Sequence, residues 1–86
     1  MAEFYFNHPF AETKLRVEAP AGSRYVVVSQ RSDQDLEILD TFDDYDAARE
    51  LVMRTLQDAA NHIDEMGYGE DVKVTHMRLK PLPEFA

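Results

Sequence analysis

The chain of 86 residues contains no cysteine. This absence excludes disulfides, thiolate metal sites and cysteine nucleophiles, and it favours an intracellular protein. The chain also lacks the run of about 20 apolar residues that a membrane-spanning helix needs, and Met1 to Phe10 has neither the basic start nor the long apolar stretch of a signal peptide. We therefore expect one cytoplasmic domain over residues 1–86, of which residues 81–86 form an extended C-terminal tail.

Basic residues are scarce in the middle of the chain. Thirteen of the seventeen acidic residues lie between Asp33 and Asp71, where the only bases are Arg49 and Arg54, so this segment carries a net charge of −11. The remainder of the chain is slightly positive, which brings the total to −8. A concentrated negative field attracts basic partners and repels nucleic acid, whose binding depends largely on Lys and Arg. The sequence therefore predicts a protein partner with a basic surface and no direct contact with nucleic acid or membrane.

Five segments have the apolar or alternating pattern of β-strands and are bounded by proline, glycine or polar turns. They are Glu3–Asn7, Thr13–Glu18, Ser23–Gln30, Leu36–Thr41 and Asp71–Lys80. The third is apolar on both faces from Tyr25 to Val28, which favours a central strand that is covered on both sides. In the last, the apolar residues change parity near Thr75 and His76. This change predicts either a bulge or a strand with apolar side chains on both faces.

The segment from Asp44 to Met66 has the periodicity of an amphipathic helix. Asp43 is placed as the N-cap, Asp44 and Asp46 fall in the first turn, where the helix dipole favours acids, and Gly67 is placed as the C-terminal stop. The apolar residues project onto one broad face: Ala48, Leu51, Val52, Leu56, Ala59, Ile63 and Met66.

The opposite face of this helix is polar and mostly acidic. Its residues are Asp46, Glu50, Arg54, Gln57, Asp58, Asn61, Asp64 and Glu65, five acids and one base. Three interpretations are open: a solvated face that serves solubility, an adaptation to high salt, or a recognition surface for a basic partner. The nearly neutral flanks argue against salt adaptation. In the third interpretation the acids Asp33, Asp35 and Asp43 extend the surface.

Met53 projects at the edge of the helix, beside Asp46 and Gln57 and away from the centre of the apolar face. One interpretation is that its flexible side chain fills the rim of the core. The other is that it serves as an apolar anchor inside a charged interface, a combination that is common in protein complexes. In that second interpretation Met53 belongs with the acidic residues as part of the partner-binding surface.

The sequence contains no pattern typical of a catalytic or metal site. No two of the three histidines have the i, i+4 spacing of a helical zinc site; they are His8, His62 and His76. The segment from Asp33 to Glu37 opens like a calcium loop, but Ile38 and Asp44 stand where an EF-hand needs glycine and glutamate. We expect structural roles for the histidines and a protein without enzymatic activity, metal or cofactor.

The element order predicts an α+β fold: an antiparallel β-sheet of four to five strands with one long amphipathic helix packed on one face, in the order β-β-β-β-α-β. One helix covers only one face of such a sheet, although apolar residues point to both. The second face then needs the N-terminal segment and the C-terminal tail, with Leu82 and Phe85, or another copy of the chain in a homodimer.

This combination resembles the small acidic proteins with which phages inhibit bacterial defence, including anti-CRISPR proteins. The resemblance rests on small size, on acidity and on the strand–hairpin–helix order of Tyr25 to Val28, Leu36 to Thr41 and Asp44 to Met66, and it assigns no site residue. It implies an inhibitor that occupies the basic nucleic-acid channel or the assembly surface of its target.

The preferred hypothesis is therefore a non-enzymatic binding protein whose acidic face engages a basic protein surface and blocks a nucleic-acid-binding complex by steric and electrostatic competition. The alternative is a small structural or assembly subunit that forms homo-oligomers through its sheet, with the acidic face serving solubility. The two differ in whether the helix or the sheet carries the main contact.

Overall fold

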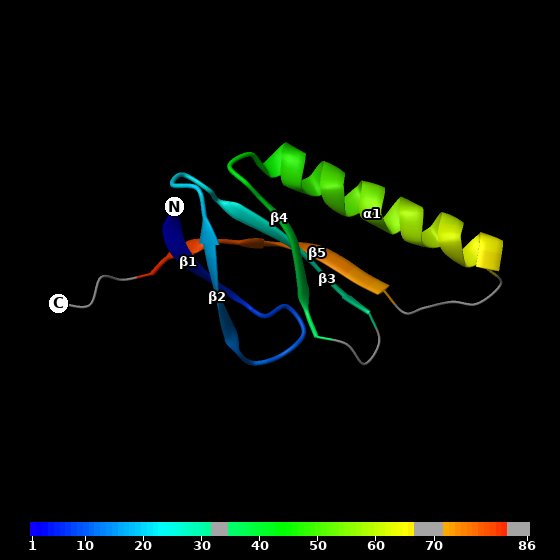
Figure 1. The fold of residues 1–86 in the computed structure, drawn as a ribbon, viewed down its shortest axis with the longest axis horizontal. Coiled ribbons are helices and arrows are strands. Elements are labelled where there is room, and N and C mark those ends of the chain that lie inside the picture. Colours follow the sequence, from blue (N-terminus) through cyan, green and yellow to red (C-terminus); the bar gives the residue numbers. More distant parts are fainter. Residues whose placement is uncertain (32–34, 67–71, 83–86) are drawn as a thin grey trace.

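A computed structural model of the chain describes residues 1–31, 35–66 and 72–82, of which residues 59–66 are described by their backbone alone. Its elements confirm the α+β class and are drawn in Figure 1. In chain order they are β1 (Ala2–Asn7), β2 (Lys14–Ala19), β3 (Tyr25–Arg31), β4 (Glu37–Phe42), α1 (Tyr45–Met66), β5 (Val72–Arg78) and β6 (Lys80–Pro81). No helix in this part of the chain is long and apolar enough to cross a membrane.

The described strands form two three-stranded antiparallel sheets instead of the single sheet that the sequence predicts. The N-terminal sheet has the order β2-β1-β6, and the central sheet has the order β4-β3-β5. The expected last strand is divided at Leu79, so that two strands follow the helix. Leu79 is buried, and its N–H donates to the carbonyl of Arg24 at 2.8 Å. The buried Leu79 therefore anchors the chain at the point where it passes from the central sheet to the N-terminal sheet.

The main core lies between the two sheets. Its buried side chains are Phe4, Phe6, Ala19, Val26, Val28 and Leu79. The face of the central sheet that the helix does not cover is thus covered by the N-terminal hairpin β1–β2 of the same chain. Leu82 continues the pairing of β6 with β1, because its N–H donates to the carbonyl of Glu3 at 3.2 Å, but its half-buried side chain is not among those of the core between the sheets. Phe85, expected to act with Leu82, lies outside the described residues.

The opposite face of the central sheet carries α1 (Figure 1). Val27 and Ala48 are fully buried, and Tyr45 at the start of α1 contacts two rings on the sheet. The centroid of the Tyr45 ring lies 5.7 Å from that of Tyr25 and 5.1 Å from that of His76, both in edge-to-face geometry. This aromatic group fixes the first turn of the helix on β3 and β5, so the layers follow in the order N-terminal sheet, central sheet, helix.

The parity change in the last strand comes from apolar residues on both faces. β5 pairs with β3 without a break from Val72 to Arg78, and Met77 packs toward the core between the sheets. The bulge lies in β4 instead, where the partners of Val27 and Val28 are Asp40 and Ile38. Of the two options that the sequence left open for the last strand, apolar side chains on both faces is confirmed and a bulge near Thr75 and His76 is wrong.

Asp44, and not Asp43, is the N-cap of α1. The N–H of Ala48 donates to the backbone carbonyl of Asp44 at 3.2 Å, and the N–H of Asp46 donates to its carboxylate at 3.4 Å. The cap lies one residue later than predicted because a helix that starts at Tyr45 directs the Tyr45 ring onto Tyr25 and His76 of the sheet. The expected stop at Gly67 lies outside the described residues.

Candidate functional site

The outward face of α1 is the first part of the candidate site. Ala48 is buried and Leu51 and Val52 are half-buried against the sheet, as the helical periodicity predicts. This packing leaves a row of polar residues exposed, as expected: Asp46, Glu50, Arg54, Gln57 and Asp58. Leu56, which the periodicity also places on the apolar face, is 42% exposed, so the predicted buried face is confirmed at Ala48, Leu51 and Val52 but is wrong at Leu56.

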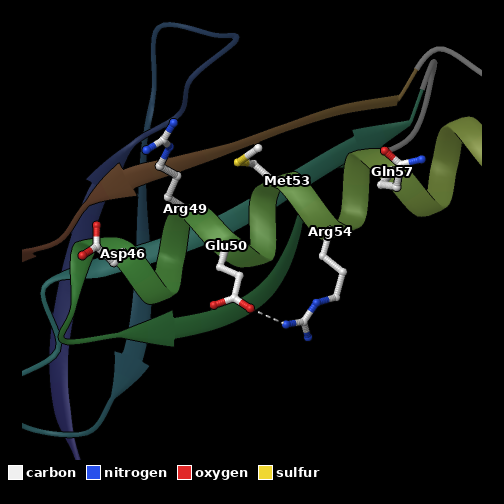
Figure 2. A pocket seen from close by; sticks show the side chains of 6 residues that line it. All are labelled: Asp46, Arg49, Glu50, Met53, Arg54 and Gln57. Atoms are coloured by element: carbon white, nitrogen blue, oxygen red, sulfur yellow. Dashed lines mark hydrogen bonds and ion pairs between the residues drawn. The ribbon is translucent and has the colours of Figure 1, made fainter.

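A shallow hollow of about 570 Å³ lies on this outward face (Figure 2). Its lining consists of Asp46, Arg49, Glu50, Met53, Arg54 and Gln57. Met53 is 59% exposed, so it does not fill the rim of the core. Figure 2 shows Arg49 and Met53 on one side of the face and Glu50 and Arg54 on the other. Met53 is therefore an apolar side chain within a ring of charged and polar groups.

The charges of this hollow balance, because two acids and two bases line it. Arg54 Nη2 lies 2.9 Å from Glu50 Oε1 in an i, i+4 ion pair whose side chains are largely exposed. Such a pair contributes only about 0.3–0.5 kcal/mol, so it biases the two side chains without locking them. Arg49 was not among the predicted site residues. The available signal was its position four residues before Met53, which places both on one stripe of the helix.

Strand β4 supplies the second part of the site. Its bulge brings Glu37 and Asp40 to the same face of the central sheet as α1, opposite Ser29 and Val27 of β3. Residues three apart in a regular strand point to opposite faces. These two acids were therefore not foreseen as neighbours of the helix.

We call the exposed acids from Asp35, just before β4, through β4 and the following turn to Asp58 of α1 the acidic surface. Its members are Asp35, Glu37, Asp40, Asp43, Asp44, Asp46, Glu50 and Asp58. The segment from Asp35 to Asp58 has only two bases, Arg49 and Arg54. The excess of negative charge in this region thus comes from the six of these acids that do not line the balanced hollow.

The predicted site residues are only partly brought together. Asp46, Glu50 and Met53 line the hollow, and Asp58 is exposed one turn beyond Arg54. β4 spans about 20 Å, so Asp35 and Asp43 are exposed at opposite ends of that strand. Asp33 and the side chains of Asp64 and Glu65 lie outside the described residues.

The histidines with described side chains have local contacts. His8 Nδ1 accepts a hydrogen bond from the N–H of Phe10 at 3.0 Å, and His76 belongs to the aromatic group with Tyr25 and Tyr45. The side chain of His62 is not among those described. Within the described residues, no group of three or more His, Asp or Glu side chains is arranged to hold a metal ion.

This surface can attract positively charged groups and can offer them a small apolar contact. Exposed carboxylates produce a field that accelerates encounter with a basic surface. An exposed methionine provides contact area that adapts to the shape of a partner. Comparisons with protein-family models, with curated proteins and with solved structures give no match for this chain.

Proposed function

We propose that this chain is a non-enzymatic cytoplasmic binding protein whose acidic surface engages a basic surface of a protein partner. The observation that carries the proposal is the exposed Met53 inside a charged ring, with eight exposed acids on and beside the same helix. Protein interfaces commonly combine a few apolar anchors with a charged surround that sets encounter rate and partner choice. An exposed acidic face that served solubility alone would need no exposed methionine beside it.

The two parts of the surface have different roles in binding. The acids accelerate association, and because charges are screened beyond about 8–10 Å at physiological salt, the association rate falls as ionic strength rises. Met53 is desolvated only in the complex, so it mainly slows dissociation. A partner that fits must place a small apolar recess within a field of Lys and Arg.

We further propose that the partner is a nucleic-acid-binding complex and that the chain is an inhibitor of the phage-encoded, anti-CRISPR type. About 34 Å of duplex carries about 20 phosphates, roughly half of which face one partner. The acidic surface has eight acids, a number close to that half. It can therefore compete electrostatically for a basic channel and block it sterically, although it does not reproduce the regular spacing of phosphates.

Capture from a cell lysate with immobilised variants tests the role of the acids. Glu37→Lys with Asp58→Lys reverses two charges of the acidic surface. The matched control, Glu12→Lys with Glu18→Lys, changes the net charge equally on the hairpin β1–β2, where both residues are exposed. We expect basic proteins to be retained by the wild type and the control at low salt, lost at high salt, and lost from the acidic-surface variant. Equal capture by both variants would contradict the proposal.

A second experiment tests the anchor and the inhibitor type. Met53→Ala should shorten the lifetime of the captured complex without changing the circular dichroism spectrum, because the side chain is largely exposed. Addition of the wild-type chain to the purified partner should release bound nucleic acid in a mobility-shift assay. Retention of nucleic acid at saturating protein would refute inhibition by competition and leave only simple binding.

A further inference from the structure

Strand β5 lies at one edge of the central sheet, whose order is β4-β3-β5, and no described strand pairs with its outer side. The N–H of Leu79 donates to the carbonyl of Arg24, so these two residues form a hydrogen-bonded pair that continues the register of β3 with β5. Hydrogen-bonded pairs alternate along an antiparallel ladder. Every second residue of β5 therefore directs its N–H and C=O groups away from β3, toward the open edge: Val72, Val74, His76 and Arg78.

A long contact at His76 agrees with this direction. The hydrogen bond described for the His76 carbonyl comes from the hydroxyl of the adjacent Thr75 at 3.5 Å, which is longer than the usual range for such a bond. A carbonyl in the interior of a strand is ordinarily bonded to a neighbouring strand. The outer edge of β5 is thus a row of backbone groups that can still accept a partner strand.

The other edges formed by the described strands have features that prevent strand pairing. β4 is bulged and carries two acids, β2 alternates charged side chains along its length, and β6 has only two residues. β5 has no bulge, no proline and no acid. Its one lysine, Lys73, does not extend over the edge, because its ammonium group lies 5.2 Å from the centroid of the Phe10 ring in a cation–π contact.

We infer that β5 pairs antiparallel with β5 of a second copy of the chain, which joins two central sheets into one of six strands in the order β4-β3-β5-β5-β3-β4. The occupant is a second copy because the strand is complementary to itself. With a two-fold axis at Thr75, all seven residues pair, and the four outward-directed residues form hydrogen-bonded pairs with one another. Lys73 lies opposite the partner's Met77, and Arg78 lies opposite the partner's Val72, so no like charges are directly opposed.

An aromatic group lies beside the axis on the helix side of this contact. Val74 lies opposite the partner's His76, and a β-branched side chain opposite an aromatic one is a favourable cross-strand pair. His76 in turn contacts the ring of Tyr45 at a centroid distance of 5.1 Å. Tyr45 is 45% exposed although its ring lies on the sheet. Since His76 is adjacent to Thr75 at the axis, the dimer covers part of this exposed ring.

The size of the contact predicts a weak dimer. Seven residues of strand give a strip about 23 Å long, and its height is about 20 Å between the helix and the N-terminal sheet on the two faces. Two such strips bury about 900 Å² together, which is below the range of about 1,200–2,000 Å² for stable complexes. Each chain also has a net charge of −8, so the two copies repel at low salt. We therefore expect a dimer that dissociates on dilution.

A single introduced cysteine tests the register, because the chain contains no other. In the two-fold pairing, Thr75 and the partner's Thr75 have Cα atoms about 4.5 Å apart, within the range of about 4.4–6.8 Å that a disulfide needs. Thr75→Cys should therefore form a disulfide-linked dimer on mild oxidation. Lys73→Cys, on the same face, is the matched control; its two copies lie about 13 Å apart along the strands and should stay monomeric. Any other pattern of cross-linking overturns the inference.

Sedimentation velocity tests the association without a cross-link. The wild type should increase in mass with concentration from monomer to dimer and stop there, because a two-fold contact uses the β5 edge of both copies. Val74→Pro removes an N–H group that points to the open edge and leaves the ladder with β3 intact, so this variant should remain monomeric with an unchanged circular dichroism spectrum. Glu18→Pro places a proline on the outer strand β2 instead and should dimerise like the wild type. A wild type that is monomeric at every concentration, or a folded Val74→Pro variant that dimerises, contradicts the contact.

The dimer does not depend on the proposed function. β3 separates β4 from β5, so the acids of β4 lie at the two outer ends of the six-stranded sheet and stay accessible. Salt screens the repulsion between the two acidic chains, so the dimer fraction should rise with salt, whereas capture of basic proteins should fall. A dimer fraction that falls with salt would overturn the pairing of strands as its cause. Val74→Pro should still capture basic proteins from a lysate at low salt, so self-association and partner capture fail independently of one another.

Discussion

At the scale of single residues, Asp44 fixes where α1 begins. Its carbonyl and its carboxylate accept the N–H groups of Ala48 and Asp46. We expect Asp44→Ala to lower the free energy of unfolding by about 1 kcal/mol, measured by urea denaturation. Asp43→Ala, one residue earlier, is the control and should change it by less than about 0.5 kcal/mol. Equal losses at both positions would contradict the assignment of the cap.

Gly22 is a second position where one residue type is required. The N–H of Ser23 donates to the carbonyl of Pro20 at 3.0 Å, and Gly22 has a φ of 95°, as the third residue of a type II turn needs. A Cβ there would meet no atom within 4 Å, so the cost of a side chain lies in the backbone alone. We expect Gly22→Ala to destabilise the fold by about 1 kcal/mol and Gly22→Asn by less, since asparagine tolerates positive φ. Thermal denaturation of both variants would reveal any reversal of this order.

At the scale of elements, the hairpin β1–β2 is held by side chains that point into the core between the sheets. Phe6 is fully buried there. We expect Phe6→Ala to cost about 3–5 kcal/mol, a large part of the 5–15 kcal/mol typical of a whole domain. Asn7→Ala, exposed on the same strand, should cost less than about 0.5 kcal/mol. Urea denaturation checks both values, and a small loss for Phe6→Ala would mean that the hairpin does not cover the central sheet.

Elements were predictable to within two residues because local patterns determine them. Hydrophobic alternation, turn residues and helical periodicity are properties of short segments. The division into two sheets was not predictable, because alternation shows that Leu79 is buried but not which strands lie on either side of it. Contacts between distant segments decide that point.

In the candidate site, too, only the part that depends on a local pattern was predictable. Helical projection identified Asp46, Glu50 and Met53 correctly as neighbours on the outward face. It could not identify Glu37 and Asp40, because the bulge that places both beside the helix has no local signal in β4. Non-local pairing thus limits what one sequence reveals about a surface built from two elements.

At the scale of the whole molecule, the net charge of −8 is unevenly distributed. The segment from Asp35 to Asp58 has eight acids and two bases. The ion pairs Glu50–Arg54 and Glu3–Arg16 are both exposed and contribute little to stability. Repulsion among the acids of β4 and α1 therefore opposes folding more than these attractions favour it.

This imbalance predicts that the protein becomes more stable as salt is added. Screening weakens the repulsion between charges separated by more than about 10 Å at 0.1 M salt, so the free energy of unfolding should rise with sodium chloride in urea denaturation. Asp35→Asn with Asp43→Asn, both exposed, should be more stable than the wild type at low salt and should respond less to salt. A fall in stability with salt would mean that attraction between opposite charges dominates, in which case the acids of this surface are held by bases within the chain and are less available to a partner.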